Sequence, residues 1–163
     1  MRPAREADLA GIDAIYSHYI LHTAITFDLE PFTPEARREW FGHYGETGPH
    51  RLLVAEREGR VVGYAGSHPF RAKRAYDTSV ETSVYLEAGR GGRGLGTALY
   101  AALLDALRGE DVHRAIAGVT LPNPASLALH ARFGFEPAGV MHEVGRKLGR
   151  YWDVQWLEKS LRT

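Results

Sequence analysis

Cysteine is absent from this 163-residue chain. Its absence excludes disulfides, a thiolate nucleophile, iron–sulfur clusters and zinc sites with cysteine ligands. The eight histidines are scattered, without the spacing or the acidic partners of a metal site. We therefore predict a protein without a bound metal.

A surplus of charge of either sign is also absent, because 20 Lys and Arg residues balance 20 Asp and Glu residues. A protein that coats nucleic acid or is steered to a membrane surface would carry a strong basic excess. No apolar run approaches the length of a membrane span, and the first residues are polar, unlike the apolar core of a signal peptide. We expect a cytoplasmic protein that binds neither nucleic acid nor membrane.

Internal repeats, linkers and low-complexity runs are missing too. Hydrophobic residues make up 44% of the chain and charged residues 25%, the ordinary balance of a globular protein. At this length one continuous core forms without staples such as disulfides. The sequence predicts a single domain over residues 1–163.

Regular hydrophobic spacing places the expected elements. It predicts helices over 8–20, from 33 onward, 97–108 and 125–133, and strands over 51–56, 61–70, 78–86, 115–120, 138–147 and 151–161. Asp8 is expected to cap the first helix, and the second, starting at Thr33, is expected to bring Trp40 and Phe41 into the core. This order of elements indicates an α+β sandwich built on one sheet.

The strand over 78–86 alternates without interruption. Because successive side chains of a strand point to opposite faces, one face carries Thr78, Val80, Thr82, Val84 and Leu86. The other face carries Ser79, Glu81, Ser83 and Tyr85. An acid on this second face is either a functional carboxylate or a solvent-facing residue paired with a nearby cation.

A glycine-rich loop, GRGGRGLG at 89–96, separates this strand from the next helix. Its backbone N–H groups and the helix N-terminus would together favour a phosphate group. The loop satisfies the dinucleotide pattern G-x-G-x-x-G, but the strand before it is half polar and the acid expected after the second strand is missing. A P-loop is excluded, because no Gly-Lys-Ser/Thr follows. The remaining alternatives are a coenzyme loop and a flexible surface loop.

Two segments resemble the signatures of the GNAT acetyltransferases. The first is RGLGTALYAALL at 93–104, in which Gly94 and Gly96 match the glycines that surround the pyrophosphate of acetyl-CoA. The second is NPASLALHARFGF at 123–135, which matches the helix beside the pantetheine arm. Gly91 departs from the Gln or Arg of the pattern, and Arg90 and Arg93 are candidates to replace that side chain.

The resemblance extends along the chain to the phosphinothricin N-acetyltransferase subgroup. It includes TAITFD at 23–28, VETSVY at 80–85 and the C-terminal motif formed by Gly145, Lys147, Gly149, Arg150, Tyr151 and Asp153. The resemblance implies a mostly antiparallel, twisted sheet with helices on both faces, and a homodimer. It also implies transfer of an acetyl group from acetyl-CoA to the α-amine of phosphinothricin, methionine sulfoximine, methionine sulfone or a similar amino acid.

The resemblance further implies which residues contact the coenzyme. The strand over 84–86 would offer backbone groups to the pantetheine amides and an unpaired amide to the oxyanion of the tetrahedral intermediate. The loop and the helix starts would hold the phosphates. The expected coenzyme-binding residues are Val84, Tyr85, Leu86, Gly92, Arg93, Gly94, Leu95, Gly96, Thr97, Asn123 and Ser126.

Two side chains are candidates for proton transfer. An ammonium cannot attack a thioester, so a carboxylate must accept its proton, directly or through water. The position of Glu81 matches the presumed base of the subgroup. His130 stands where many superfamily members place a tyrosine, and it is the candidate proton donor to the leaving thiolate; a structural histidine is the alternative. His142 is a second, weaker candidate.

Acceptor recognition needs cations for a carboxylate and a phosphinate or sulfoximine group. The densest basic cluster is Arg71, Lys73 and Arg74, and the arginine fork suits such oxygens. We predict that Arg71 and Lys73 bind the substrate and that Phe27 forms a wall of its pocket. Solvated residues at a connecting loop and an aromatic core plug are the alternatives.

Two other functions stay open. One is a related transferase acting on another amine, such as a peptide N-terminus or a polyamine; the basic cluster argues against a polyamine. The other is a non-catalytic acetyl-CoA-binding module, which the retained Glu81 disfavours. Without a cysteine to carry an acyl group, an enzyme of this kind would transfer the acetyl group directly within a ternary complex.

Overall fold

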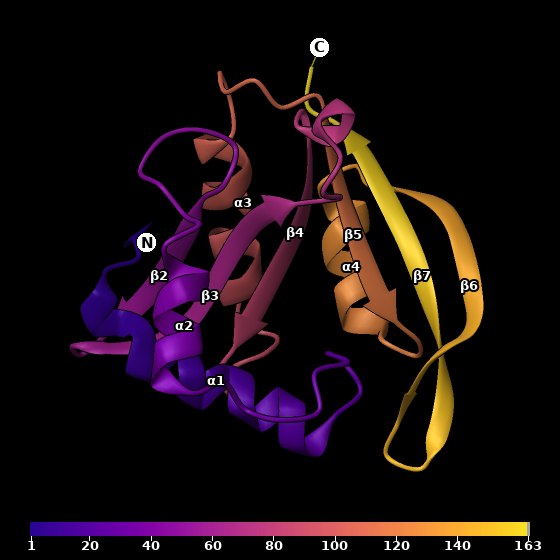
Figure 1. The fold of residues 1–163 in the computed structure, drawn as a ribbon, viewed down its shortest axis with the longest axis horizontal. Coiled ribbons are helices and arrows are strands. Elements are labelled where there is room, and N and C mark those ends of the chain that lie inside the picture. The colour runs from indigo at the N-terminus through magenta and orange to yellow at the C-terminus, as the bar shows by residue number, and fades with distance from the viewer. Residues whose placement is uncertain (163) are drawn as a thin grey trace.

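The computed structural model describes residues 1–162, whose strands form one seven-stranded sheet (Figure 1). Only β4 and β5 are parallel neighbours; every other pair is antiparallel. In spatial order the strands are β1 (Arg2–Pro3), β2 (Leu52–Arg57), β3 (Arg60–Pro69), β4 (Ser79–Leu86), β5 (Arg114–Thr120), β7 (Arg150–Ser160) and β6 (Glu136–Lys147). This one continuous sheet is compatible with a single domain over residues 1–163. That the chain forms one domain stays a prediction.

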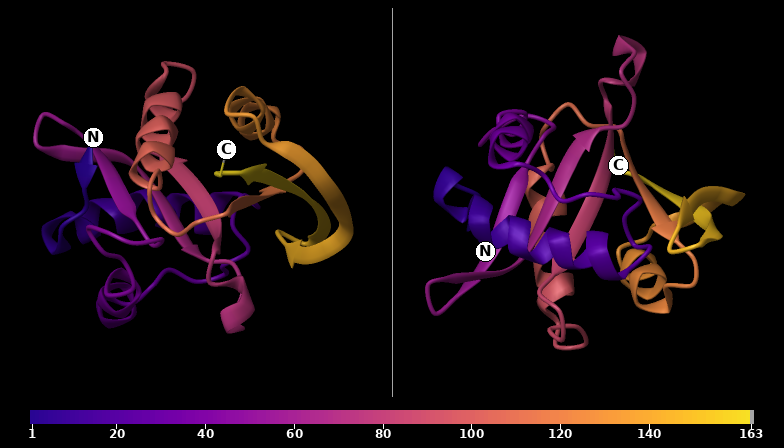
Figure 2. Two further views of the ribbon diagram at one scale, coloured as in Figure 1. Left: turned by 90° about the horizontal axis from the view of Figure 1, so that it is seen from above. Right: turned by 60° about the horizontal axis from the view of Figure 1, so that its bottom comes forward.

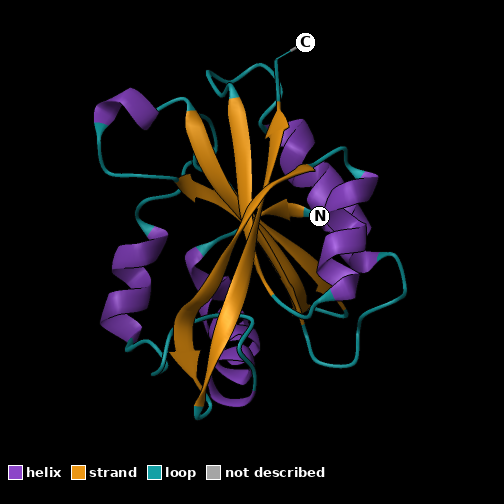
Figure 3. Ribbon diagram, turned by 90° about the vertical axis from the view of Figure 1, so that its right-hand side faces the viewer, coloured by secondary structure: helices purple, strands orange, loops and turns teal. Residues whose placement is uncertain are grey.

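Helices cover both faces of this sheet. Figure 2 shows α1 and α2 on one side and α3 and α4 on the other. Their bounds are α1 (Leu9–His22), α2 (Pro34–Phe41), α3 (Leu95–Ala106) and α4 (Pro124–Arg132), and short 3-10 turns span Glu6–Asp8 and Arg74–Tyr76. The strands fan out strongly when the sheet is seen along its edge (Figure 3), as the right-handed twist of strands requires. The predicted α+β fold, mostly antiparallel with helices on both faces, is confirmed.

The two faces of β4 pack into two separate cores, as the alternation predicts. Val80 is fully buried against the α3 side, where Leu99, Tyr100 and Leu103 are also enclosed. On the opposite side, Tyr85 packs against the cluster that α1 forms with β2 and β3. The polar face of β4 therefore points toward α1 and α2.

The ladder between β4 and β5 is short. Three pairs join the strands, the last of them Glu81 with Ile116; beyond this pair the strands separate, as Figure 1 shows. The Thr82 hydroxyl donates its one proton to the Ile116 carbonyl (3.2 Å). The Tyr100 hydroxyl, 2.7 Å from the Thr82 oxygen, therefore donates to that oxygen. These side chains end the ladder, and the backbone of 84–86 has no β5 partner.

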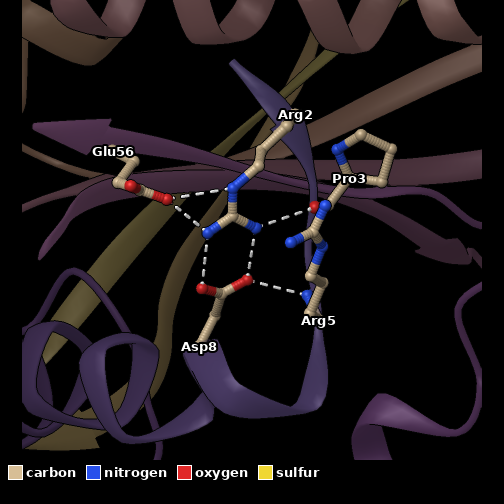
Figure 4. Close-up of polar contacts among 5 residues, drawn as sticks. All are labelled: Arg2, Pro3, Arg5, Asp8 and Glu56. Carbon is tan, nitrogen blue, oxygen red and sulfur yellow. Dashed lines mark hydrogen bonds and ion pairs between the residues drawn. The ribbon is translucent and has the colours of Figure 1, made fainter. Parts of the chain in front are cut away.

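The role of Asp8 differs from the expected helix cap. Its carboxylate accepts two hydrogen bonds from the Arg2 guanidinium (2.7 and 2.8 Å) and one from the Arg5 backbone N–H (Figure 4). Arg2 also donates to Glu56 on β2, so the carboxylate ties β1 to the start of α1. A 3-10 turn precedes α1, which leaves Asp8 in a helical conformation that cannot cap. Hydrogen bonding to Arg2 holds the pKa of Asp8 below its ordinary value.

We expect Asp8→Asn to lower the free energy of unfolding by about 2 kcal/mol at neutral pH, because charge-assisted hydrogen bonds are lost. Because the pKa of Asp8 is lower in the folded protein, this stabilisation is fully present at pH values above the pKa of the unfolded carboxyl. It is lost as the pH falls through the lower pKa of the folded protein. Denaturant unfolding of both proteins from pH 7 to pH 2 measures the difference. Glu35→Gln, which removes an exposed ion pair with Arg38, is the control and should cost almost nothing. A constant difference at all pH values would contradict the assignment.

Helix α2 begins as predicted, since the Thr33 hydroxyl accepts from the Ala36 N–H (3.2 Å) and Pro34 occupies the first turn. Trp40 and Phe41 are half-buried and pack against the core cluster that α1 forms with β2 and β3. The fully buried residue of the helix is Arg37, which the hydrophobic pattern does not predict.

Among residues 1–162 no helix is long and apolar enough to span a membrane.

Candidate active site

Two adjoining cavities lie where β4 and β5 separate. The acceptor-side cavity, as we call it, has a volume of about 570 Å³ and lies between the sheet, α2 and the loop over 23–32. The loop-side cavity, also about 570 Å³, lies between the glycine-rich loop and α4. Both are lined by Ile25, Val84, Tyr85, Asn123 and Ser126. The two cavities therefore adjoin at the strand opening, with these residues between them.

The floor of the acceptor-side cavity follows from the register of β3 and β4. Three neighbouring pairs face it: His68 with Glu81, Gly66 with Ser83, and Tyr64 with Tyr85. The middle pair is small, whereas the pairs at either end carry large polar or aromatic groups. The cavity therefore has a charged end at Glu81 and an aromatic end at Tyr85.

Glu81 is half-buried and lines the acceptor-side cavity. Burial raises the pKa of its carboxyl, and the positive charges of His68 and Arg71 partly offset that rise. Within residues 1–162 no side chain hydrogen-bonds to this carboxylate. It is consequently free to accept a proton from a molecule in the cavity.

His130 is buried in the wall of the acceptor-side cavity, with 4% of its surface exposed. Its Nδ1 lies 2.8 Å from the Ser126 carbonyl, which can only accept, so Nδ1 carries the proton. Nε2 is enclosed and has no partner among the described residues, and burial lowers the pKa of the ring. The neutral ring thus presents a lone pair, and its role as a proton donor stays a prediction that needs a second proton on Nε2. His142 is exposed, lies 3.1 Å from Asp153 and lines neither cavity.

The predicted substrate residues are only partly brought together. Phe27 lines the acceptor-side cavity. Arg71 and Lys73 are exposed and do not line it; the Arg71 guanidinium lies 4.4 Å from the Phe70 ring, and Arg74 is exposed beside Asp77. Arg71 still acts on the cavity through its charge, which reaches Glu81. The arginine that does line the cavity is Arg37, which the sequence did not single out.

Most of the predicted coenzyme residues meet at the loop-side cavity. Nine of the eleven line it: Val84, Tyr85, Leu86, Gly92, Gly94, Gly96, Thr97, Asn123 and Ser126. The other two do not line the cavity. Arg93 is exposed to solvent, and the Leu95 side chain is buried in the core, with 7% of its surface exposed. Sequence reasoning missed Tyr19, Arg132 and the small residues of α4 that complete the lining.

The glycine-rich loop leaves this cavity open. Gly92 and Gly94 have φ of 76° and 77°, a region that side chains other than glycine rarely adopt. A Cβ built on Gly91, Gly92 or Gly94 would meet nothing within 4 Å, so the backbone itself faces free space. Helix α3 begins at Leu95, directly after this loop, so its N-terminus lies beside the loop. This geometry fits a pyrophosphate group held by N–H groups.

The two candidate replacements for the missing side chain at Gly91 are placed differently. The Arg90 Nε donates to Glu87 (2.7 Å), so this arginine is already paired. Arg93 is exposed. Of the two, Arg93 is therefore the one whose guanidinium has no ion-pair partner among residues 1–162.

The C-terminal hairpin and α1 together hold the loop over 23–32 in place. From the hairpin the Lys147 Nζ donates to the Thr26 carbonyl (2.7 Å), and from α1 the Tyr16 hydroxyl donates to Asp28 (2.7 Å). Gly145 lies against the Phe27 ring so closely that any Cβ there would overlap its Cε2 and Cζ atoms. The motif residues Gly145 and Lys147 therefore position a wall of the acceptor-side cavity, a role that the motif alone did not reveal.

Comparison with known proteins agrees with this geometry. Residues 14–135 match the acetyltransferase (GNAT) family. The chain is 56% identical to a phosphinothricin N-acetyltransferase of Streptomyces coelicolor, covering 99% of this chain and 95% of that protein. It is 35% identical to an L-methionine sulfoximine/L-methionine sulfone acetyltransferase of Pseudomonas paraeruginosa, covering 99% and 94%.

A solved structure extends the likeness to the backbone. An acetyltransferase from Salmonella typhimurium, determined with its cofactor acetyl-CoA, superposes with a TM-score of 0.94 at 34% identity, covering 99% of this chain and 93% of that one. Family match, sequence identity and fold all point the same way, and they agree with the two cavities that meet at the strand opening. The chain belongs to the GNAT family of acetyltransferases.

Proposed function

We propose that this acetyltransferase moves the acetyl group of acetyl-CoA to the α-amine of phosphinothricin, methionine sulfoximine, methionine sulfone or a similar amino acid. The observation that carries the proposal is the placement of Glu81 at the strand opening that joins the two cavities. The names of the relatives at 56% and 35% identity supply the substrate class.

The loop-side cavity would hold acetyl-CoA. The N–H groups of the glycine-rich loop and of the start of α3 would bind its phosphates, and the side of the 84–86 strand that has no β5 partner would bind its pantetheine arm. The thioester then lies at the opening between β4 and β5. An N–H of this strand segment would stabilise negative charge on the carbonyl oxygen during transfer.

Glu81 would prepare the acceptor. An amino acid in the acceptor-side cavity arrives mainly as its ammonium form, which has no lone pair for attack. The Glu81 carboxylate, directly or through one water, would accept that proton. Since the chain has no cysteine, we infer a single direct transfer, with both substrates bound together.

His130 would stand beside the departing sulfur. Its neutral ring, with Nδ1 hydrogen-bonded to the Ser126 carbonyl, would have to gain a proton on Nε2 before it could donate one. Arg71 would act from the rim on the α-carboxylate, whereas Lys73, exposed and lining neither cavity, is the weaker of the two predicted substrate cations.

Release of free thiol from acetyl-CoA tests the proposal. The acceptors are phosphinothricin, methionine sulfoximine, methionine sulfone, a polyamine and a peptide with a free N-terminus. We expect turnover with the first three and intersecting initial-velocity lines when both substrates are varied. Turnover only with the peptide or the polyamine would move the enzyme to another acceptor class, and binding of acetyl-CoA without any turnover would favour a non-catalytic module.

We expect Gly145→Val to raise the KM for the acceptor about tenfold (~1.4 kcal/mol) and to leave the KM for acetyl-CoA unchanged. The reason is steric, because the new side chain must displace the Phe27 ring from the cavity wall. Steady-state kinetics with each substrate varied in turn measures both constants. Arg146→Val places the same side chain at the next, exposed position and should change neither. An unchanged acceptor KM in Gly145→Val would remove Phe27 from the acceptor pocket.

The homodimer and the cytoplasmic location remain part of this proposal, as does the absence of a metal. Within residues 1–162 no three His, Asp or Glu side chains are grouped to hold a metal ion. Light scattering of the purified enzyme would measure its oligomeric state.

A further inference from the structure

Arg37 is a buried cation whose role the proposed reaction leaves unexplained. It lies on α2 with 2% of its surface exposed, although arginine is almost never fully buried unless it is paired. Its Nε donates to the Asp13 carboxylate on α1 (2.5 Å). This ion pair accounts for one of its three nitrogens.

Aromatic rings surround the guanidinium. Its Cζ lies 4.3 Å from the centre of the Phe32 ring, 4.4 Å from Trp40 and 5.3 Å from Tyr16. Such contacts stabilise the cation and hold its plane in one orientation. The remaining nitrogens are thus fixed in space before any ligand arrives.

Those two nitrogens are available to a ligand. Within residues 1–162 neither Nη1 nor Nη2 has an acceptor at hydrogen-bond distance. Neither atom is fully enclosed, because the one fully enclosed side-chain nitrogen or oxygen without a partner among these residues is His130 Nε2. Arg37 is also the one Arg or Lys among the described residues that lines the acceptor-side cavity. A cation with two unpaired donor nitrogens therefore forms part of the wall of that cavity.

Arg37 stands at the end of the cavity away from Glu81. The Arg37 guanidinium carbon lies 5.3 Å from the centre of the Tyr16 ring, and the Tyr16 ring lies 5.1 Å from the Tyr85 ring. At the other end of the cavity the residue paired with Glu81 is His68. Tyr64 is paired with Tyr85, four residues along β4 from Glu81, a separation of about 13 Å. Ser83 and the side-chain-free Gly66 lie between the two ends.

We propose that Arg37 binds the oxygen atoms at the far end of the acceptor side chain: those of a phosphinate, a sulfoximine or a sulfone. This inference rests on the proposed function, because the α-amine must lie beside Glu81. The α-carboxylate shares a carbon with that amine and so lies at the same end, within the field of Arg71. The side chain then extends over Ser83 toward Arg37, whose two free donors match a tetrahedral phosphorus or sulfur centre with two oxygens or an oxygen and a nitrogen.

A pair of acceptors isolates this contact. Methionine sulfone and methionine share the amine, the carboxylate and the carbon chain, and they differ only in the two sulfur-bound oxygens. We expect Arg37→Met to lower the ratio of kcat/KM for the sulfone to that for methionine at least tenfold. Arg38→Met, the neighbouring exposed arginine of the same helix, should leave the ratio unchanged.

Calorimetric dissociation constants for the two amino acids give the same ratio without turnover. Arg37→Lys keeps the charge but loses the paired donors, so it should lower the ratio in the same direction and is the variant to use if Arg37→Met does not fold. Equal losses for both acceptors, or an unchanged ratio, would overturn the role of Arg37. Absence of wild-type turnover with every amino acid would overturn the proposed function instead.

Discussion

Glu81→Gln should lower kcat/KM for the acceptor by about 10²- to 10⁴-fold at neutral pH, the usual contribution of a general base. The substitution keeps the size and shape of the side chain and removes only its ability to accept a proton. KM for acetyl-CoA should stay unchanged, because Glu81 lines the acceptor-side cavity alone. Steady-state kinetics from the ordinary titration range of glutamate up to pH 10 measures the effect.

The pH profile supplies the sharper test. Burial raises the pKa of Glu81, so the wild-type rate should fall with acid through a limb that lies above the ordinary range of glutamate. This limb should be missing from Glu81→Gln. The variant should instead gain activity toward alkaline pH, where more of the acceptor is already an amine. Near-wild-type turnover of the variant at neutral pH would remove Glu81 as the base.

A second carboxylate provides the matched control. Asp28 lines the same cavity and is held by the Tyr16 hydroxyl. If Glu81 acted only through the negative charge that it adds to the cavity, Asp28→Asn would reduce the rate by a similar factor. We expect Asp28→Asn to leave the acid limb of the profile in place, because Asp28 is not the proton acceptor.

The acceptor-side cavity shows where sequence reasoning succeeds and where it stops. Alternation places Glu81 on one face of its strand, and that face is the same in the fold; the resemblance to the subgroup is what makes Glu81 the candidate base. Arg37 was missed because α2 carries two adjacent arginines, and the helical pattern does not say which one turns inward. Its partners Asp13 and Phe32 lie on other segments, so the site exists only after those segments pack together.

The same distinction applies to Asp8 and to the C-terminal motif. Asp8 fits the local pattern of a helix cap, but Arg2 reaches it from β1, a strand of two residues that is too short to show any periodicity. Gly145 and Lys147 were recognised as a pattern, yet their contacts with the loop over 23–32 span about three quarters of the chain. Local capping and periodicity describe elements; long-range pairing decides which side chains meet.

Gly96→Val should raise the KM for acetyl-CoA about 100-fold (~2.7 kcal/mol) while the protein remains folded. Gly96 lines the loop-side cavity at the first turn of α3, and a Cβ built there has its nearest neighbours at 3.6 Å, on Leu86, and 3.9 Å, on Leu129. A branched side chain would therefore fit against the protein but would occupy the space between α3 and α4. Its φ is not in the left-handed region, so no backbone strain accompanies the change.

This last property makes Gly96 a better test of the coenzyme site than Gly94. Gly94 has a φ of 77°, so a side chain there would strain the loop as well as fill it. Ala98→Val adds the same side chain to the exposed face of α3 two residues later and should leave both KM values unchanged. Thermal unfolding should show both variants within a few degrees of the wild type. If Gly96→Val kept a wild-type KM for acetyl-CoA, the coenzyme would have to lie outside the cavity between the glycine-rich loop and α4, and the role of the loop as a phosphate site would have to be given up.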